Sequence, residues 1–510
     1  MEFLLTKIIA TLGPASSESN TILKLIQQGV RIFRVNFSHG TFEDYNLLLK
    51  NIRNAEKESG EHIAVLGDLS GPKIRVGKVV KEGVDLKKGQ KVSFVKKQVI
   101  TGEKGSESVF CSTFPLFIDE VKKGERILLN DGNVELKCVG RKGKGENMTL
   151  VCEVVDGGVI TTAKGINLPE SELSVPSMTE KDFKCAKFAV EKDFDYLALS
   201  FVRSGKDVKI LKDELARLGA RPKTKIDTKG DLGFTEESEG LKNYIPIISK
   251  IEKPQAIDNL KEIIDETDGV MVARGDLGVE MDIAEVAVLQ KKIIHMCQEH
   301  GRPVIVATQM LESMINSPVP TRAEVSDVAN AIFDGADAVM LSGETAVGKY
   351  PVQTVQMMRR IAAKTNTFIK EHGLKTGASI NKVFMNRSAA IADGVKTIVE
   401  DLNPKFLIVW TNLGGSAVNL SQQRTTVPII AFNDDEKRLR QLSLLYSIKP
   451  VFMKLPKSGS EFIRSIDKIL LENKWASKGD PIIIVSPDPI HKQGITNRIV
   501  IHYLGESVDD

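Results

Sequence analysis

Residues 303–341 read PVIVATQMLESMINSPVPTRAEVSDVANAIFDGADAVML, with a short β-branched or apolar run at each end. Between these runs, residues 322–333 place apolar side chains at helical spacing, as do 20–28 and 283–299 elsewhere. The strand–helix–strand pattern recurs, with strands expected near Ile8, Ile32, Val65, Leu197, Ile247, Val270, Val304 and Val339. Most centres lie about 25 to 35 residues apart, the length of one βα unit. Such units in series predict an α/β fold, a closed parallel (β/α)8 TIM barrel, rather than an open sheet.

One interval, from Val65 to Leu197, is several times longer than a βα unit. Residues 72–167 within it carry Gly–Lys turns and period-two alternation, as in KVSFV and MTLVCEVV. This pattern of alternation and turns predicts a small antiparallel β-barrel domain, inserted after the third barrel strand. Because barrel enzymes hold their active sites at that edge, we interpret the insertion as a lid. A decorative insertion is the alternative.

The rest of the chain divides into two parts. We expect the barrel (domain A) to comprise residues 1–71 and 168–355, around the lid (domain B) at 72–167. The apolar runs FLIVW, VPIIAF, KPVFM and PIIIVS predict a C-terminal α/β parallel-sheet domain (domain C) over 356–510. The polar stretch 223–243 predicts a surface excursion before the fifth barrel strand.

Composition restricts the class of protein. Hydrophobic residues make up 42% and charged residues 27% of the chain, which is typical of a globular protein and not of a disordered one. The net charge of +3 argues against nucleic acid as an obligatory partner. No apolar run is long enough for a membrane span, and we expect no signal or transit peptide. The five scattered cysteines predict free thiols in a reducing cytoplasm.

Polar residues gather where six of the expected barrel strands end. These ends are Arg34 to His39, Asp68, Lys250 to Glu252, Ala273 to Asp276, Thr308 to Gln309, and Ser342 to Glu344. A single polar ending is commonly a cap or a solvated loop. Six endings on one rim of a barrel instead predict an active site, because that rim is where the carboxyl ends of the strands converge.

The residue types at this rim point to phosphoryl chemistry. Glu252 and Asp276 end neighbouring strands, so their carboxylates can share a hard cation such as Mg²⁺ or Mn²⁺. Strand alternation puts Lys250 on the same side as Glu252, where its charge suits a transferring phosphoryl group. A structural salt bridge between this lysine and glutamate is the alternative. Arg34 offers a fork that matches phosphate or carboxylate, and His39 is either a core or cap histidine or a nucleotide contact.

Eight segments resemble those of pyruvate kinases, in the same order and over nearly the whole chain. They are TKIIATLGPAS, RVNFSHG, GDLSGPKIRVG, IISKIE, MVARGDLGVE, ATQMLESM, PTRAEVSDVANAIFDGADAVMLSGETA and KGDPIIIVS. The resemblance implies the family's architecture of a barrel, an inserted lid and a C-terminal α/β domain. It also implies transfer of a phosphoryl group from phosphoenolpyruvate to ADP, giving pyruvate and ATP in the last step of glycolysis, and usually a homotetramer.

The resemblance assigns roles residue by residue. Lys250 matches the catalytic lysine, Arg34 a phosphate-binding arginine, and Glu252 and Asp276 the ligands of the divalent cation. The substrate site would take in Ala273, Gly275, Asp276 and Thr308, and proton delivery Ser342 and Glu344. The nucleotide and monovalent-ion positions match Asn36, Ser38, His39, Asp68 and Arg75. Ser204 follows SFVR where many relatives have lysine, which puts the nucleotide contacts from that side in doubt.

An effector site is expected after the strand FLIVW. Hydroxyls and glycine amides at a helix start suit phosphate, and this segment resembles the family's effector loop. Its residues are Thr411, Asn412, Gly414, Gly415 and Ser416. The loop at 486–496 lacks the Trp and Arg of relatives that bind fructose 1,6-bisphosphate. We therefore expect a sugar monophosphate or AMP as effector, and a bare helix cap is the alternative.

Potassium is expected not to be required. Potassium-dependent relatives carry Glu within G-P-E-I-R, whereas this chain has Lys73 there, and Leu69 follows Asp68. A tethered ammonium supplies the same single positive charge as a bound K⁺ without capture of an ion. The resemblance thus places Lys73 as a substitute for the monovalent cation, and a solvated hinge lysine is the alternative.

Two rival functions share parts of this pattern. A barrel aldolase acting on a pyruvate enolate could use the same Lys, Glu and Asp cluster, but it would need neither ADP nor a lid. A metabolite-sensing scaffold without catalysis could keep the fold, but it would not need Lys250, Glu252 and Asp276 together. A coupled assay for ATP made from phosphoenolpyruvate separates all three.

Overall fold

The computed structural model describes residues 3–106, 108–171, 174–220, 243–374, 376, 387–492 and 495–507. Eight parallel strands close a barrel in the order β1, β16, β15, β14, β13, β12, β3, β2. They are β1 (Lys7–Thr11), β2 (Val30–Asn36), β3 (Ala64–Leu69), β12 (Tyr196–Leu199), β13 (Ile247–Ile251), β14 (Gly269–Ala273), β15 (Val304–Ala307) and β16 (Ala338–Leu341). Every strand centre expected from the sequence is confirmed, and so is the closed barrel.

Helices surround the barrel. They are α1 (Ser19–Gln27), α2 (Phe42–Ser59), α4 (Glu180–Glu191), α5 (Gly205–Arg217), α6 (Pro254–Asp258), α7 (Leu260–Glu266), α8 (Arg274–Glu280), α9 (Ile283–Glu299), α10 (Arg322–Phe333), α11 (Gly343–Ala346) and α12 (Pro351–Glu371), with the 3₁₀ turn η3 (Glu312–Ile315). The start of α10 shows a local signal from which the sequence predicts where a helix begins. The Thr321 hydroxyl accepts from the Glu324 N–H at 3.2 Å, and the Glu324 carboxylate accepts from the Thr321 N–H at 2.7 Å.

The insertion after β3 is built of β4 (Val84–Leu86), β5 (Lys91–Val95), β6 (Val109–Phe110), α3 (Phe117–Glu120), β7 (Arg126–Leu129), β8 (Val134–Lys142), η1 (Gly145–Asn147), β9 (Thr149–Asp156), β10 (Gly158–Ile160) and β11 (Ile166–Asn167). Six of its strands form one sheet and β4 with β10 a second, and all pairs are antiparallel except β5 with β6. The expected small β-barrel is confirmed, because residues 74–77 bridge the two ends of the six-stranded sheet. The end strands β6 and β11 do not pair with each other directly. Between them, the Val76 N–H donates to the Lys164 carbonyl and the Gly77 N–H to the Cys111 carbonyl, each at 2.8 Å.

The C-terminal part contains α13 (Arg387–Leu402), β17 (Phe406–Trp410), α14 (Gly415–Gln422), β18 (Ile429–Asn433), α15 (Glu436–Leu442), β19 (Ile448–Phe452), α16 (Gly459–Glu472), β20 (Pro481–Ser486) and β21 (Arg498–Tyr503). The four expected strands pair in parallel, and β21, which sequence reasoning missed, adds an antiparallel edge. Leu444 from this part joins the cluster of side chains that fills the barrel interior.

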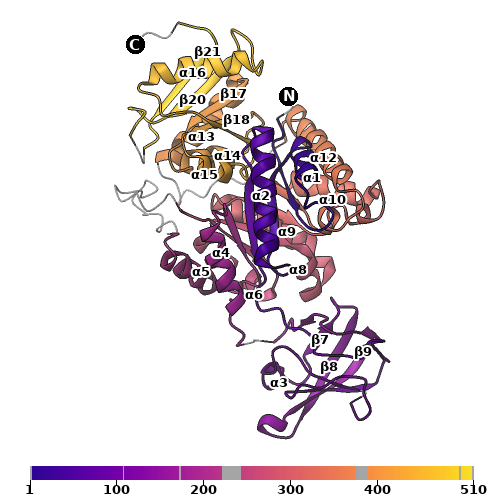
Figure 1. Cartoon of the computed structure of the whole chain (residues 1–510). Helices are drawn as coiled ribbons and strands as arrows, with labels where there is room; N and C mark the ends of the chain where they lie inside the picture. Colours follow the sequence, from indigo (N-terminus) through magenta and orange to yellow (C-terminus); the bar gives the residue numbers. More distant parts are fainter. Residues whose placement is uncertain are drawn as a thin grey trace.

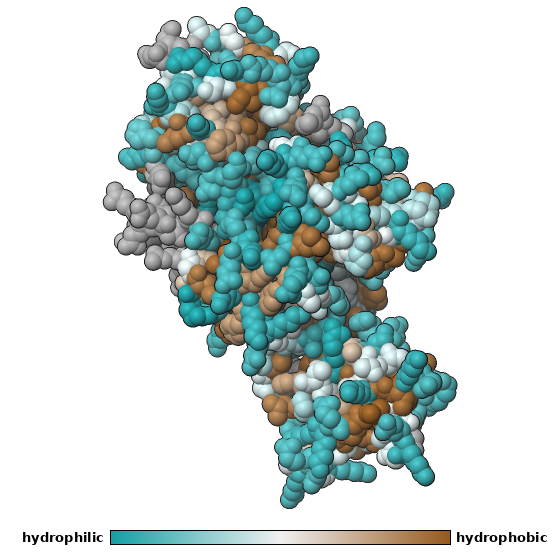
Figure 2. Space-filling view, viewed as in Figure 1, coloured by the Kyte–Doolittle hydropathy of each residue, from teal (hydrophilic) through white to brown (hydrophobic). Residues whose placement is uncertain are grey.

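The lid and the C-terminal part lie at opposite ends of the barrel (Figure 1). The surface seen in Figure 2 is mostly hydrophilic, with hydrophobic patches over the lid and the barrel. In the part of the chain that is described, no helix combines the length and apolar character needed to cross a bilayer. All five cysteines are buried and free, as expected from the sequence. The polar stretch at 223–243 lies outside the described residues except for its last residue.

Candidate active site

Lys250 and Glu252 stand at the carboxyl end of β13 and face the same side, as strand alternation predicts. The Lys250 ammonium lies 2.9 Å from Glu252 Oε1 and 3.3 Å from Asp68 Oδ1. Burial lowers the pKa of Lys250, but the two carboxylates outweigh burial and hold its pKa above the ordinary lysine value. Lys250 is therefore a fixed positive charge in a buried position.

Asp68, at the end of β3, links Lys250 to Arg34. Arg34 Nε donates to Asp68 Oδ2 at 2.6 Å, and its Nη1 donates to the Thr11 hydroxyl at 3.2 Å. Burial raises the pKa of Asp68, yet Lys250 and Arg34 together hold it below its usual range. Two cations are thus held side by side on one buried carboxylate.

Sequence reasoning missed Ser200, which directly follows β12. Its hydroxyl accepts from Lys250 Nζ at 2.8 Å and donates to Asp68 Oδ1 at 3.3 Å. The next residue, Phe201, has φ +55° and donates its N–H to Glu252 Oε2 at 2.7 Å. The position of Ser200 at a strand end was a usable signal, but a serine there resembles any loop residue.

Glu252 and Asp276 fit a divalent cation. Glu252 Oε1 accepts no hydrogen bond although it is buried, because the nearby ammonium lies outside hydrogen-bond geometry. Burial raises the pKa of Glu252 to about 7, and the nearby Asp276 carboxylate adds to the rise. Among the described residues no cluster of three or more His, Cys, Asp or Glu side chains could hold a metal. Two carboxylates at this rim are therefore the candidate ligands, and an all-oxygen pair of this kind suits a hard cation.

The start of α8 is fastened to the loop that follows β15. Gly275 donates its N–H to the Thr308 hydroxyl at 2.7 Å, and Arg274 donates to the Thr308 carbonyl at 2.8 Å. Thr308 itself has φ +69°, an uncommon conformation for a β-branched residue. The structure thus brings the Ala273–Asp276 turn and Thr308 together as expected. The Gly275 N–H, which was expected to face a substrate carboxylate, instead donates to the Thr308 hydroxyl.

Ser342 and Glu344 meet at the end of β16. Glu344 is fully buried and accepts from the Ser342 N–H at 2.7 Å and from the Leu311 N–H at 3.1 Å. The Ser342 hydroxyl is buried with no hydrogen-bond partner. Glu344 therefore links two loops of the rim, and the Ser342 hydroxyl is the unpartnered polar group of this pair.

The remaining expected residues lie around this cluster. Asn36 pairs with Asp68 in the register of β2 and β3, and its side chain accepts from the Ser38 N–H at 3.0 Å. Lys73 Nζ lies 3.9 Å from Asp276 Oδ1, at the entrance to the lid. Arg75 instead donates to the Ala163 carbonyl within the lid at 2.9 Å. His39 is exposed, and its backbone carbonyl accepts from the Tyr45 hydroxyl at 2.7 Å.

The loop expected to bind an effector lines a small cavity of about 40 Å³ with Ser388, Trp410, Pro487, Ile495 and Thr496. Two of its polar side chains already have partners within the fold. The Thr411 hydroxyl accepts from the Gly414 N–H at 3.1 Å, and Asn412 Oδ1 accepts from the Trp410 indole N–H at 2.8 Å. Gly415 and Ser416 begin α14 and line the cavity.

Comparison with family models matches two parts of the chain. Residues 4–232 and 234–355 match a model described as pyruvate kinase, barrel domain, and residues 389–502 match one described as pyruvate kinase, alpha/beta domain.

Curated relatives match over nearly the whole chain. A pyruvate kinase of Thermotoga maritima is 39% identical, covering 97% of this chain and 98% of that protein. One of Mycobacterium tuberculosis is 36% identical, covering 98% of each. Among solved structures, a crystal structure of a pyruvate kinase from Cryptosporidium parvum has a TM-score of 0.85 at 32% identity, covering 98% of this chain and 96% of that one.

Proposed function

The chain belongs to the pyruvate kinase family, and from this premise we propose which of its residues carry out the reaction. As a member it transfers a phosphoryl group from phosphoenolpyruvate to ADP, giving pyruvate and ATP in glycolysis. One observation supports the assignment of the site above all: the buried Lys250 ammonium held between Asp68 and Glu252. A buried, positioned cation suits a reaction in which the protein mainly places groups and neutralises charge.

Lys250 and Arg34 act on the transferring phosphoryl group. Their shared partner Asp68 holds both cations at fixed positions, so their charge is available without reorganisation during the transfer. Arg34 provides a guanidinium fork for phosphate oxygens. In this arrangement the phosphoryl group moves from one oxygen to the other while Lys250 faces it.

The family generally uses a divalent metal, and we assign its protein ligands to Glu252 and Asp276. Mg²⁺ or Mn²⁺ suits an all-oxygen donor set, and the bound cation supplies charge neutralisation for the substrate oxygens. Ala273 and Gly275 place the substrate beside Asp276, with Thr308 adjoining them. The unpartnered Ser342 hydroxyl, oriented by the Glu344 contact to its N–H, serves the protonation of enolpyruvate.

ADP binds on the side of Asn36, Ser38, His39 and Arg75, between the rim and the lid. At the lid entrance, Lys73 acts in place of a monovalent cation, supported by its approach to Asp276. We expect near-full activity in sodium- and potassium-free buffer with a bulky organic cation. Lys73→Glu should lower activity and potassium should partly restore it, with Leu69→Thr added if needed. A wild-type rate that rises tenfold or more with potassium would contradict this role.

Thr411, Asn412, Gly414, Gly415 and Ser416 form the proposed site for a sugar monophosphate or AMP. Support comes from the hydroxyls and glycine amides that line the cavity at the start of α14. A metabolite screen of initial rates tests it. Activation by fructose 1,6-bisphosphate alone would show that the preference for a monophosphate is wrong.

The division into domain A (1–71 and 168–355), domain B (72–167) and domain C (356–510) remains our proposal, although the barrel helix α12 runs across the boundary at 355. A homotetramer and a cytoplasmic location are proposals as well. Two apolar surfaces support oligomers. The edge strand β21 exposes Ile499, Ile501 and Tyr503 on one face, and α9 exposes Ile283 and Val288.

The test of the active site is Lys250→Met. We expect phosphoryl transfer to fall by several orders of magnitude while phosphoenolpyruvate and Mn²⁺ still bind, as measured by coupled ATP formation and by titration calorimetry. Lys261→Met is the matched control, because Lys261 is an exposed lysine on α7 that pairs with Asp265 on the same helix. Near-normal turnover in the Lys250 variant would remove Lys250 from its role.

A further inference from the structure

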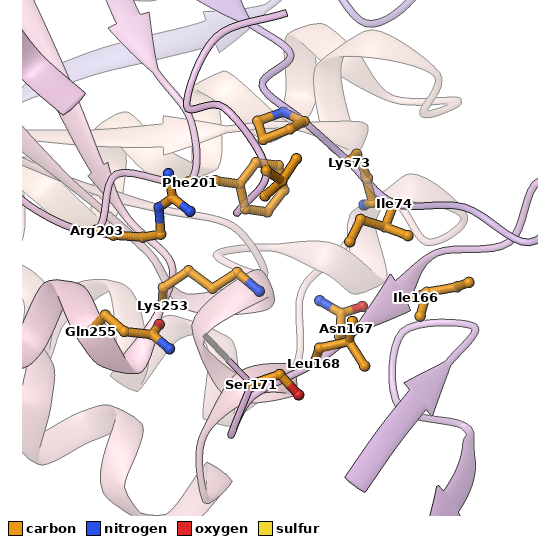
Figure 3. Close-up of a pocket in the computed structure, with 12 residues that line it drawn as sticks. Lys73, Ile74, Ile166, Asn167, Leu168, Ser171, Phe201, Arg203, Lys253 and Gln255 are labelled. Atoms are coloured by element: carbon orange, nitrogen blue, oxygen red, sulfur yellow. The ribbon is translucent and has the colours of Figure 1, made fainter. Parts of the chain in front are cut away.

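The lid is joined to the barrel by two chain segments that flank a cavity of about 160 Å³. The outgoing segment leaves β3 through Gly71 and Lys73, and the return segment enters through β11. Figure 3 shows Lys253 and Asn167 facing each other across one side of this cavity. The contacts around it therefore fix how the lid sits on the barrel.

The return segment is bound through a buried carboxylate. Asn167 Nδ2 donates to Glu280 Oε1 at 2.7 Å, and Lys253 Nζ pairs with the same oxygen. The Glu280 side chain, at the end of α8, is fully buried. Asn167 belongs to the lid sheet, because β11 pairs with β7 there. Glu280 thus connects the lid sheet to Lys253 of the barrel.

Lys253 connects the Glu280 carboxylate to Glu252, the proposed metal ligand. It is the neighbour of Glu252 in the chain, and its ammonium lies 5.8 Å from the centre of the Phe201 ring. Phe201 donates its N–H to Glu252 Oε2 at 2.7 Å. The arrangement of Glu252 therefore depends on a residue that Lys253 contacts.

The outgoing segment meets the same aromatic ring. A Cβ at Gly71 would lie 2.8 Å from the Phe201 ring, and Gly71 has φ +63°. Glycine is needed there for both the close approach and the left-handed conformation. Both connections of the lid consequently pack against one network that ends at Glu252.

We propose that Asn167, Glu280 and Lys253 are positioning residues that hold the lid in register with Glu252. A buried ion pair is a weak source of net stability, because desolvation offsets its attraction, but it favours one geometry over its alternatives. A lid that must bring ADP in line with a phosphoryl group needs such a geometry, since small misplacements of reactants slow transfer steeply. The expected effect on kcat rests on the proposed role of Glu252. The expected effect on the ordering of the return segment, residues 164–168, does not.

The test compares Asn167→Ala with Ser171→Ala. Asn167→Ala cuts the link between the lid and Glu280 but leaves the buried ion pair intact. Ser171 lies four residues further along the same segment and lines the same cavity, but it donates to Glu125 of the lid at 2.6 Å and not to Glu280. It is therefore a matched control for the loss of one hydrogen bond.

Two readouts separate positioning from folding. In hydrogen exchange by mass spectrometry, Asn167→Ala should speed exchange at 164–168 by about tenfold while β8 and β9 in the lid stay unchanged. In initial-rate assays kcat should fall about tenfold with the KM for phosphoenolpyruvate within twofold, and Ser171→Ala should do neither. Asn167→Ser, which keeps a hydrogen-bond donor, should recover part of both losses.

Three outcomes would overturn the proposal. Unchanged exchange at 164–168 would show that Asn167 does not hold the hinge, and equal acceleration in β8 and β9 would show unfolding of the lid instead. Faster exchange without loss of kcat would remove the positioning role. Failure of the proposed active site gives a different result, because Lys250→Met would then keep its turnover whatever Asn167 does.

Discussion

Replacing Ser200 by alanine tests whether the hydroxyl between Lys250 and Asp68 serves catalysis. The side chain is buried, accepts from the Lys250 ammonium at 2.8 Å, and donates to Asp68 at 3.3 Å. A hydrogen bond to a charged group contributes about 1.5 to 3 kcal/mol. At 1.36 kcal/mol per factor of ten, kcat should fall between about 10- and 150-fold. The loss should appear in kcat, because the ammonium loses the contact that orients it toward the transferring group.

The assay couples pyruvate formation to NADH oxidation by lactate dehydrogenase, with phosphoenolpyruvate, ADP and Mg²⁺ each varied. Ser200→Thr keeps the hydroxyl and should retain most of the activity. Ser458→Ala is the control, because the Ser458 hydroxyl caps α16 in the C-terminal part. A Ser200→Ala enzyme within twofold of wild type, with a normal melting temperature, would refute the reasoning.

Three further predictions concern pH, metal and stability. Burial lowers the pKa of Lys7 to about 7 in the folded protein. Between pH 7 and about 10.5 the Lys7 side chain is therefore protonated in the unfolded chain but largely neutral in the folded one. The free energy of unfolding of the unmodified protein, relative to that of Lys7→Met, should therefore rise with pH over that range by at most about 1.4 kcal/mol per pH unit. A difference in melting temperature between the two proteins that stays constant across pH would disprove this. Chelation by EDTA should abolish turnover and Mg²⁺ or Mn²⁺ should restore it, but not in Glu252→Gln; restoration by Zn²⁺ alone would contradict an all-oxygen site. Arg424→Met removes the cation that lies 2.8 Å from the buried Asp337 carboxylate and should lower the free energy of unfolding by about 3 to 5 kcal/mol. The melting temperature should fall, and Asp337→Asn should partly restore it; an unchanged melting temperature would contradict this prediction.

The barrel was readable from sequence because its signals are local. Buried β-branched runs locate the eight strands, and the capping pair Thr321 and Glu324 sets where α10 begins. The edge strand β21 was missed, because only one of its faces is covered and its alternating pattern lacks a continuous apolar run. The lid sheet closes through bridges from Arg75 to Gly165 and from Val76 to Ser112, and alternation identifies the strands but not these contacts.

By itself, the sequence determined the order of the strands and the polar residues at their ends, including the shared face of Lys250 and Glu252. These follow from periodicity, which is a property of neighbouring residues. Only the tertiary structure decided that Ser200 holds Lys250, that Thr308 takes the Gly275 N–H, and that Asn167 reaches Glu280. Those contacts join residues far apart in the chain. They depend on closure of the barrel and on how buried polar groups find partners, which no local pattern encodes.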